Sequence, residues 1–582
     1  MSWIFGILRK SKQASLPRKG YYPLRSKKKF SVDTKDYYFS CGLGHKNSFY
    51  KYEEKKDSGW MVCGTGISYE EDAFHLMGFH DWEEFLKNKN SNIRGLNGHF
   101  VIVEWEQGHL RIRNDQLGMR DMFFADTKNF LAFSTRLDWL IPYIEEPEID
   151  FEIFSSSWLC VNPLTYECFI KNVERLGPGG TARFEDNNFT KTHQPWLPEY
   201  ALKLPDINYF DAISDLTTLG IKQNRKLLLG LSGGLDSRIL LSILLQHKRD
   251  SWSTYSFGDK NFPDAIIAKR LSEKLGFSQS TISNLYSSKY NDVDRFNEFV
   301  LQTHTYMIGS LFYEQDHYRK LDHNSLLIDG GGGGYYRRIL AKKLWLKGRQ
   351  SIIDKNSQKI RDFIRNNKPN LFTTDVSRLM DYGCDKQIIA FLEKMPDIRT
   401  FGAGNWTDLF SIYTRSANIG STTQTRLDGI IYNYMPLMQP SLLRWILSLP
   451  IIYRIKNKIY KNIILRNNNT ATKQPLVKDR SVLPFTFNTY TTHIYEKISR
   501  KLLKGHAADY GAYFLQQNKE FVLSLAQSKG IKEFPAYNQK YIEEKVTNYY
   551  RGNTSLSNDV LWWLTFDVWR MKLQENRKKL DR

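Results

Sequence analysis

The stretch LLLGLSGGLDSRILLSILL, residues 227–245, is the part of this chain that indicates its fold most clearly. An apolar run from Leu227 to Leu231 leads into the turn SGGLDS (232–237), and a second apolar run follows the turn directly. A compact apolar run, a glycine-bearing turn and a longer apolar segment predict a buried strand, a tight loop and a helix. The stretch therefore indicates the strand–loop–helix unit of an α/β domain.

The chemistry of this loop favours a phosphate group. Its two glycines let the backbone approach a ligand without interference from Cβ atoms, and successive N–H groups at the start of a helix attract an anion. The donors expected to contact phosphate are Ser232, Gly233, Gly234 and Ser237. Asp236 would repel phosphate unless a divalent cation lay between them, so we predict that it binds Mg²⁺. The alternative is a glycine-rich turn that only packs a helix against a sheet.

The chain is long enough for more than one domain. It has 582 residues, whereas a single hydrophobic core stops growing at roughly 250–300 residues. Residues 1–195 contain short alternating segments typical of strands, such as FVIVEW (100–105). From about 205 strands and helices alternate, and beyond about 340 helical patterns dominate. We expect an α+β domain built on a β-sandwich over 1–195, and an α/β parallel-sheet domain with a helical C-terminal part over 205–582.

The charge balance favours anionic partners. Lys and Arg number 83 and Asp and Glu 62, for a formal net charge of +21, and a field of this sign attracts nucleotides, nucleic acid or an anionic membrane face. The densest basic block, residues 9–29, contains no acidic residue. This block is either a polyanion contact or a solvated surface loop.

The cysteines and the hydropathy indicate a cytoplasmic protein. The five cysteines are scattered and form no CxxC pair, which argues against a disulfide framework and a zinc site and fits a reducing compartment. No apolar stretch approaches the roughly 18–20 residues that a membrane span needs. The apolar start, Trp3 to Leu8, is shorter than the hydrophobic region of a signal peptide.

Five further segments accompany the loop, which itself resembles the SGGxDS pyrophosphate loop of ATP pyrophosphatases rather than a Walker A motif. They are MSWIFGI (1–7), RNDQLGMRDMFFADTKNFLAFSTRLDWL (113–140), ERLGPGG (174–180), YMPLMQPSLLRWILSLP (434–450) and IYKNIILR (459–466). In this order they resemble the asparagine synthetase family. The resemblance implies an N-terminal domain like the class II glutamine amidotransferases, with an Ntn-type sandwich, and a C-terminal ATP pyrophosphatase domain.

The resemblance also implies a set of ligands and site residues. We expect ATP and Mg²⁺ at the SGGLDS loop, Lys461 as the catalytic cation, and Asp264 as an acidic residue after the second strand. The family's SGxGxDE segment is replaced by five glycines, residues 330–334, so the usual Asp and Glu are absent. Gly330 and Gly331 are then expected at the nucleotide, with Asp329 as a substitute metal ligand. Arg337 and Arg338 are candidates for binding pyrophosphate or an anionic substrate.

The amidotransferase half departs from the family at its reactive end. Ser2 stands where the family has a cysteine nucleophile, and Trp3 replaces a glycine. A hydroxyl is a weak nucleophile near neutral pH unless an adjacent base activates it. The family's NRGPD segment has no counterpart, and CGTGISY (63–69) stands in place of NGEIYN. We expect a sandwich that is retained for structure and lacks glutaminase activity; the alternative is that Ser2 acts as a nucleophile.

These features predict an ATP-dependent, AMP-forming amide ligase. It would adenylate a small-molecule or peptide carboxylate and transfer the acyl group to ammonia or an amine, as in β-lactam synthetases and lasso peptide cyclases, which resemble this architecture. The alternatives are a glutamine-hydrolysing asparagine synthetase, an inactive nucleotide-binding partner protein and a tRNA-modifying ATP pyrophosphatase. The family resemblance makes nucleic acid an unlikely partner, and a homodimer is compatible with it.

Overall fold

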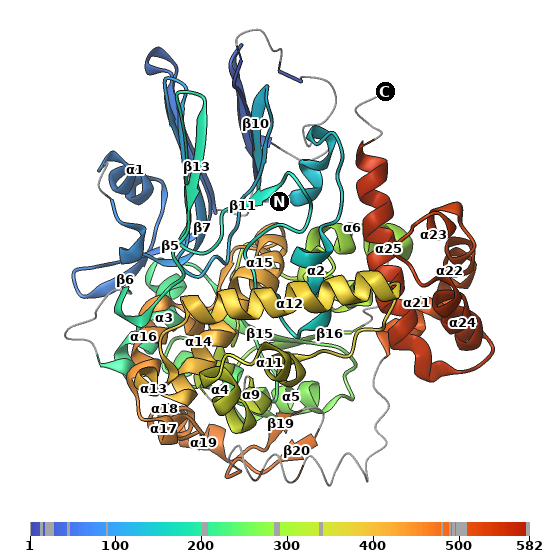
Figure 1. Ribbon diagram of the computed structural model, residues 1–582. Helices are drawn as coiled ribbons and strands as arrows, with labels where there is room; N and C mark the ends of the chain where they lie inside the picture. Colours follow the sequence, from blue (N-terminus) through green and yellow to red (C-terminus); the bar gives the residue numbers. More distant parts are fainter. Residues whose placement is uncertain are drawn as a thin grey trace.

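The structure is a computed structural model (Figure 1). It describes residues 2–11, 16–17, 28–42, 47–88, 91–200, 208–283, 291–336, 341–455, 457–478, 481–487, 491, 495 and 509–577. Two features of the sequence lie wholly or largely outside these residues: the basic block 9–29 and the pair Arg337 and Arg338. Residues 201–207, around the expected start of the second domain at about 205, are also not described.

Two antiparallel sheets form the N-terminal part. One has the order β11-β9-β10-β1-β3-β2, and the other has the order β13-β12-β8-β7-β5-β4 with β6 paired to β5. The strands of the first sheet are β1 (Ile4–Arg9), β2 (Lys28–Asp33), β3 (Tyr37–Gly42), β9 (Phe123–Asp126), β10 (Phe130–Ser134) and β11 (Glu174–Arg175). Those of the second are β4 (Ser48–Glu53), β5 (Ser58–Glu70), β6 (Ala73–Leu76), β7 (Asn97–Glu106), β8 (His109–Asn114), β12 (Thr181–Glu185) and β13 (Asn188–Thr192).

Strand β1 has no polar side chain from Ile4 to Leu8, because both of its faces are buried there. Successive side chains of a strand point to opposite faces. Ile4 and Leu8 belong to the core between the two sheets. Phe5 and Ile7, on the other face, belong to a second core that also contains residues of the C-terminal helices. The apolar start of the chain is therefore a central strand of the sandwich.

A parallel sheet forms the centre of the second part. Its order is β16-β15-β14-β17-β18, and every neighbouring pair is parallel. The strands are β14 (Leu227–Gly230), β15 (Trp252–Phe257), β16 (Gln279–Ile282), β17 (Leu326–Ile328) and β18 (Asn433–Tyr434). The connections that follow β14 and β15 contain α4 (Leu235–Leu244) and α5 (Pro263–Leu275). The strand order reverses between β14 and β17, and such switch points are where open α/β sheets bind ligands.

The C-terminal part is helical and packs against the sandwich (Figure 1). Helix α2 (Phe151–Leu159) lies along α12 (Thr374–Lys394), and the last described helix is α25 (Ser557–Arg577). The second core joins Trp3 and Phe5 to Trp563 and other residues of α25. The predicted fold class, an antiparallel sandwich followed by a parallel α/β sheet and a helical C-terminal part, is confirmed. Among the described residues, no helix is both long enough and apolar enough to span a bilayer.

A buried ion pair joins the sandwich to the second part. Asp428, the last residue of α15 (Ser421–Asp428), is fully buried. It pairs with Arg120, and its other carboxylate oxygen lies 3.0 Å from His99 Nε2. Burial alone would raise the pKa of Asp428, but His99 and the Arg120 guanidinium hold it below its ordinary value. Arg120 also donates to the backbone carbonyl of Ser2 at 3.2 Å, so the pair supports the start of β1.

The ERLGPGG segment provides a second connection. Arg175 is buried and pairs with Asp121 at 2.6 Å. The same guanidinium donates to Ala417 O at 2.6 Å and to Asn418 Oδ1 at 2.8 Å. Both acceptors lie in a π-helical turn, η8 (Ser416–Gly420). A π-turn does not make the regular i→i−4 bonds, which leaves a carbonyl available to the arginine.

Substitution Asp428→Ala should lower the free energy of unfolding by about 3 to 5 kcal/mol, because it leaves the buried Arg120 without its counter-charge. Urea denaturation followed by circular dichroism measures the change. Asp250→Ala removes an exposed carboxylate instead and should change stability by less than about 0.5 kcal/mol. Equal effects of the two substitutions would contradict the structural role of the ion pair.

Candidate functional site

The SGGLDS loop connects β14 to α4, and several of its N–H groups bond to side chains. Helix α4 begins at Leu235 with Gly234 as its N-cap. The Ser232 N–H donates to Ser237 Oγ at 3.1 Å, and the Gly234 N–H donates to Ser232 Oγ at 3.1 Å. The Gly233 N–H donates to a carboxylate oxygen from the next crossover helix. The predicted strand–loop–helix geometry is present, with these three donors already paired inside the protein.

Two carboxylates follow the strands that flank β14. Asp264 is the second residue of α5, and its Oδ1 accepts the Gly233 N–H at 2.8 Å. Asp329 follows β17, and its Oδ1 accepts the Gly331 N–H at 2.7 Å. Burial raises the pKa of both carboxyl groups. The carboxyl ends of parallel strands meet at one edge of the sheet, which brings these side chains near the loop.

A cavity of about 330 Å³ opens at this edge of the sheet. Ser232, Asp264 and Asp329 line it together, and Glu314 adds a third carboxylate. Five aromatic residues complete much of its wall: Tyr255, Phe257, Phe262, Tyr318 and Tyr510. The cavity lies at the carboxyl ends of β14, β15 and β17, beside the switch point, where a nucleotide is expected. Its size falls within the range of small-ligand pockets.

No motif in the sequence identifies the aromatic wall of the cavity. Tyr255 and Phe257 lie at the end of the predicted strand SWSTYSFG, and this position at the carboxyl end of a strand could have indicated that they line a site. Glu314, Tyr318 and Tyr510 come from distant segments that have no recognisable motif. Only the tertiary fold brings these three residues to the cavity.

The five-glycine segment packs against Asp236. A Cβ atom at Gly330 would lie 2.9 Å from Asp236 Cβ, and one at Gly333 would overlap the Asp236 carboxyl group. Gly332 adopts φ +86°, which favours glycine. The glycines therefore allow the start of α4, which carries Asp236, to approach the segment closely. This close approach holds the loop beside a carboxylate that the sequence predicts to bind magnesium.

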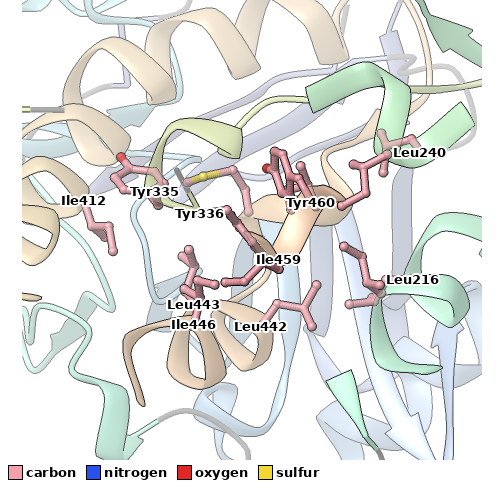
Figure 2. Packing of buried hydrophobic residues seen from close by; sticks show 14 of the residues in the cluster. Leu216, Leu240, Tyr335, Tyr336, Ile412, Leu442, Leu443, Ile446, Ile459 and Tyr460 are labelled. Atoms are coloured by element: carbon pink, nitrogen blue, oxygen red, sulfur yellow. The ribbon is translucent and has the colours of Figure 1, made fainter. Parts of the chain in front are cut away.

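An apolar core supports the glycine segment from below (Figure 2). Tyr335 and Tyr336 follow it in the short helix α8 (Gly333–Tyr336) and are buried in the cluster that Figure 2 shows. Tyr460, from α18 (Lys458–Asn467), packs beside Tyr336 and donates to Gly333 O at 3.3 Å. The core thereby fixes the glycine segment relative to α4 and α18.

Lys461 and Gly233 are not among the residues that line the cavity. Lys461 is on α18, which packs along α4, and its Nζ donates to Thr486 O at 2.8 Å. Partial burial lowers the pKa of Lys461. Gly233 is buried beneath Val477, whose side chain a Cβ atom at Gly233 would overlap. Of the predicted site residues, Ser232, Asp264 and Asp329 thus line one cavity. Asp236 instead packs against Gly330. The catalytic role of Lys461 stays a prediction.

The acidic residues fit a magnesium ion that is held partly by phosphate. Among the described residues, no group of three or more His, Cys, Asp and Glu side chains could hold a metal ion by itself. Mg²⁺ usually keeps several waters and binds one or two carboxylates together with substrate phosphates. Asp236 packs against the glycine segment and Asp329 directly precedes it, so these two carboxylates are the candidates for that arrangement.

Ser2 is buried just before the start of β1, at the position that the sequence marks as a candidate nucleophile. Its Oγ lies 3.1 Å from Ser48 Oγ, which lies 3.4 Å from Cys63 Sγ. Burial raises the pKa of the Cys63 thiol, so neither neighbour is a base near neutral pH. Trp3 fills the adjacent space and packs on Gly42.

The cavity beside Ser2 is small. It measures about 30 Å³, and its wall includes Ser2, Trp3, Arg136 and Arg175. This is about a tenth of the volume of the cavity at the SGGLDS loop.

One region of the chain matches a known protein family. Residues 214–300 match the family model described as asparagine synthase. No curated protein matches the chain significantly. Among solved structures, one match is the glutamine phosphoribosylpyrophosphate amidotransferase from B. subtilis complexed with ADP and GMP, which is 9% identical, with 48% of this chain and 90% of that chain covered and a TM-score of 0.22.

A second match, titled as the allosteric regulatory enzyme of purine biosynthesis, is 10% identical, with 60% of this chain and 78% of that chain covered and again a TM-score of 0.22. A TM-score this low supports no statement about the present chain. The family match, in contrast, covers β14, α4, β15 and α5, the elements that carry the SGGLDS loop and Asp264. Over residues 214–300 the chain is therefore similar to the asparagine synthase family.

Proposed function

We propose that this protein is an ATP-dependent, AMP-forming amide ligase that takes ammonia or an amine as its nitrogen donor. The asparagine synthase family is one of ATP-dependent, amide-forming ligases. The observation that carries the proposal is the cavity at the switch point of the parallel sheet, which Ser232 of the SGGLDS loop lines together with Asp264 and Asp329.

In the proposed reaction the nucleoside occupies the aromatic cavity, and its phosphates reach the SGGLDS loop. The N–H groups and the α4 N-terminus would neutralise part of the phosphate charge. Magnesium, held by Asp236 and Asp329 together with phosphate oxygens, would supply charge neutralisation. A substrate carboxylate attacks the α phosphorus and pyrophosphate leaves; an amine nitrogen then attacks the acyl carbon and AMP leaves. Lys461 is proposed as the cation that stabilises the charge developing during transfer.

The surroundings of Ser2 support the choice of ammonia or an amine over glutamine. Ser2 Oγ bonds to another hydroxyl, the adjacent cavity has about 30 Å³, and Trp3 fills the space where the family has glycine. A nucleophilic hydroxyl needs an activating base and room for its substrate. We propose that the sandwich supports the second domain structurally, through Arg120 and Arg175.

A second candidate is a non-catalytic nucleotide-binding protein. The glycine segment lacks the acidic residues expected there, and Val477 covers Gly233. A screen of carboxylic acids with ATP, Mg²⁺ and ammonium separates the two candidates. Release of pyrophosphate that depends on one acid supports the ligase, whereas ATP binding without release in the whole screen supports the second candidate.

Substitution Asp236→Asn should reduce pyrophosphate release by about 100-fold or more, because it removes a charged ligand from the phosphate site. A coupled pyrophosphate assay measures the rate at saturating ATP. Asn has nearly the same volume as Asp, so the contact with the glycine segment is kept. Activity close to that of the unmodified protein would refute the assignment of the loop.

Substitution Gly333→Ala should lower the same rate by about 10- to 100-fold, since the added methyl group displaces the Asp236 carboxyl. The matched control is Gly95→Ala, because a Cβ atom at Gly95 meets nothing within 4 Å. The control should leave pyrophosphate release unchanged. If both variants behave alike, the glycine segment does not position Asp236.

Substitution Ser2→Ala should leave ammonium-supported pyrophosphate release within about twofold, because the lost hydrogen bond contributes only about 1 kcal/mol to stability. The unmodified protein should release no glutamate from glutamine, as measured with glutamate dehydrogenase. Glutamate release by the unmodified protein that Ser2→Ala abolishes would show a working glutaminase.

A further inference from the structure

The loop proposed to bind phosphate already holds an anion from the protein. The Gly233 N–H, a donor that would face a phosphate oxygen, donates to Asp264 Oδ1 at 2.8 Å. In the same loop the Ser237 hydroxyl accepts a hydrogen bond from the Ser232 N–H, and the Ser232 hydroxyl accepts one from the Gly234 N–H. The carboxylate is the one negatively charged partner among these contacts, and a carboxylate oxygen resembles a phosphate oxygen in charge and in its preference for N–H donors.

The fold places Asp264 there for a local reason. Pro263 occupies the first position of α5 and Asp264 the second. Proline is favoured at that first position, and an acidic residue in the first turn is stabilised by the positive end of the helix. The helix start lies beside the loop because α5 follows β15, the neighbour of β14 in the sheet. Asp264 thus reaches the Gly233 N–H from a different crossover unit.

We propose that Asp264 is a positioning residue that accepts the Gly233 N–H in place of phosphate and that the nucleotide's phosphate must displace it. The inference rests on the proposed function, because it assigns a role at the same loop. The bond between Asp264 and the Gly233 N–H holds the loop in its shape. When phosphate enters, the two negative charges repel, and the carboxylate turns away from the amide.

If Asp264 is removed, this role and a role as metal ligand predict different changes in ligand binding. If Asp264 competes with phosphate, its removal strengthens the binding of an anion in the absence of metal. If Asp264 instead holds magnesium with the nucleotide, its removal weakens MgATP binding and leaves metal-free anion binding unchanged. A variant that is merely damaged also binds more weakly, so tighter binding is a result that structural damage does not produce.

The test is isothermal titration of inorganic pyrophosphate in the presence of EDTA. The proteins are the full chain and its variants Asp264→Ala, Asp264→Asn and Asp259→Ala. Asp259 lies in the same β15–α5 connection and is exposed, so its substitution controls for the loss of one negative charge nearby. Asp264→Ala should bind pyrophosphate about tenfold more tightly than the unmodified chain, a difference of about 1.4 kcal/mol.

The affinity of Asp264→Asn for pyrophosphate should lie between those of the unmodified chain and Asp264→Ala, because its amide oxygen still accepts the Gly233 N–H but carries no charge. Asp259→Ala should stay within about twofold of the unmodified chain. Binding by Asp264→Ala that is equal to or weaker than that of the unmodified chain overturns the inference. If the unmodified chain still releases pyrophosphate from ATP, the proposed function survives that result; if no protein binds pyrophosphate or ATP, both fall.

Discussion

The architecture of the site depends on a close approach of separate segments around the SGGLDS loop. Val477 covers Gly233 from one direction, and the glycine segment meets Asp236 from another. A side chain at Gly233 or Gly333 would overlap these neighbours. Packing between segments of the protein therefore requires glycine at both positions.

The sandwich is joined to this site by buried polar contacts and by shared apolar cores. Arg120 and Asp428 are both fully buried, and Arg175 reaches the π-turn η8. The core that contains Trp3 also contains Trp563. A shared core and buried ion pairs of this kind oppose independent motion of the two parts. A sandwich without glutaminase chemistry would thus still be needed to bury one face of the helical part.

Much of the fold could be predicted from periodicity, and part of the site from one motif. The apolar runs of β7 and β14 are typical of buried strands, and SGGLDS indicated a loop between strand and helix. The bond from Gly233 to Asp264 could not be predicted, because it depends on the relative placement of two crossover units. The same holds for Tyr510, which reaches the cavity from the C-terminal helices. Local pattern carries no information on such long-range contacts.

A crystal structure with α,β-methylene-ATP and Mg²⁺ tests the nucleotide site most directly, since the methylene group prevents cleavage between the α and β phosphates. We expect phosphate density at the amides of residues 232–237, with the nucleoside between Tyr255 and Asp329. We also expect the Gly233 amide to face phosphate and Asp264 to have turned away. A nucleotide bound elsewhere, or a Gly233 N–H that still donates to Asp264 in crystals saturated with the analogue, would contradict the proposed site.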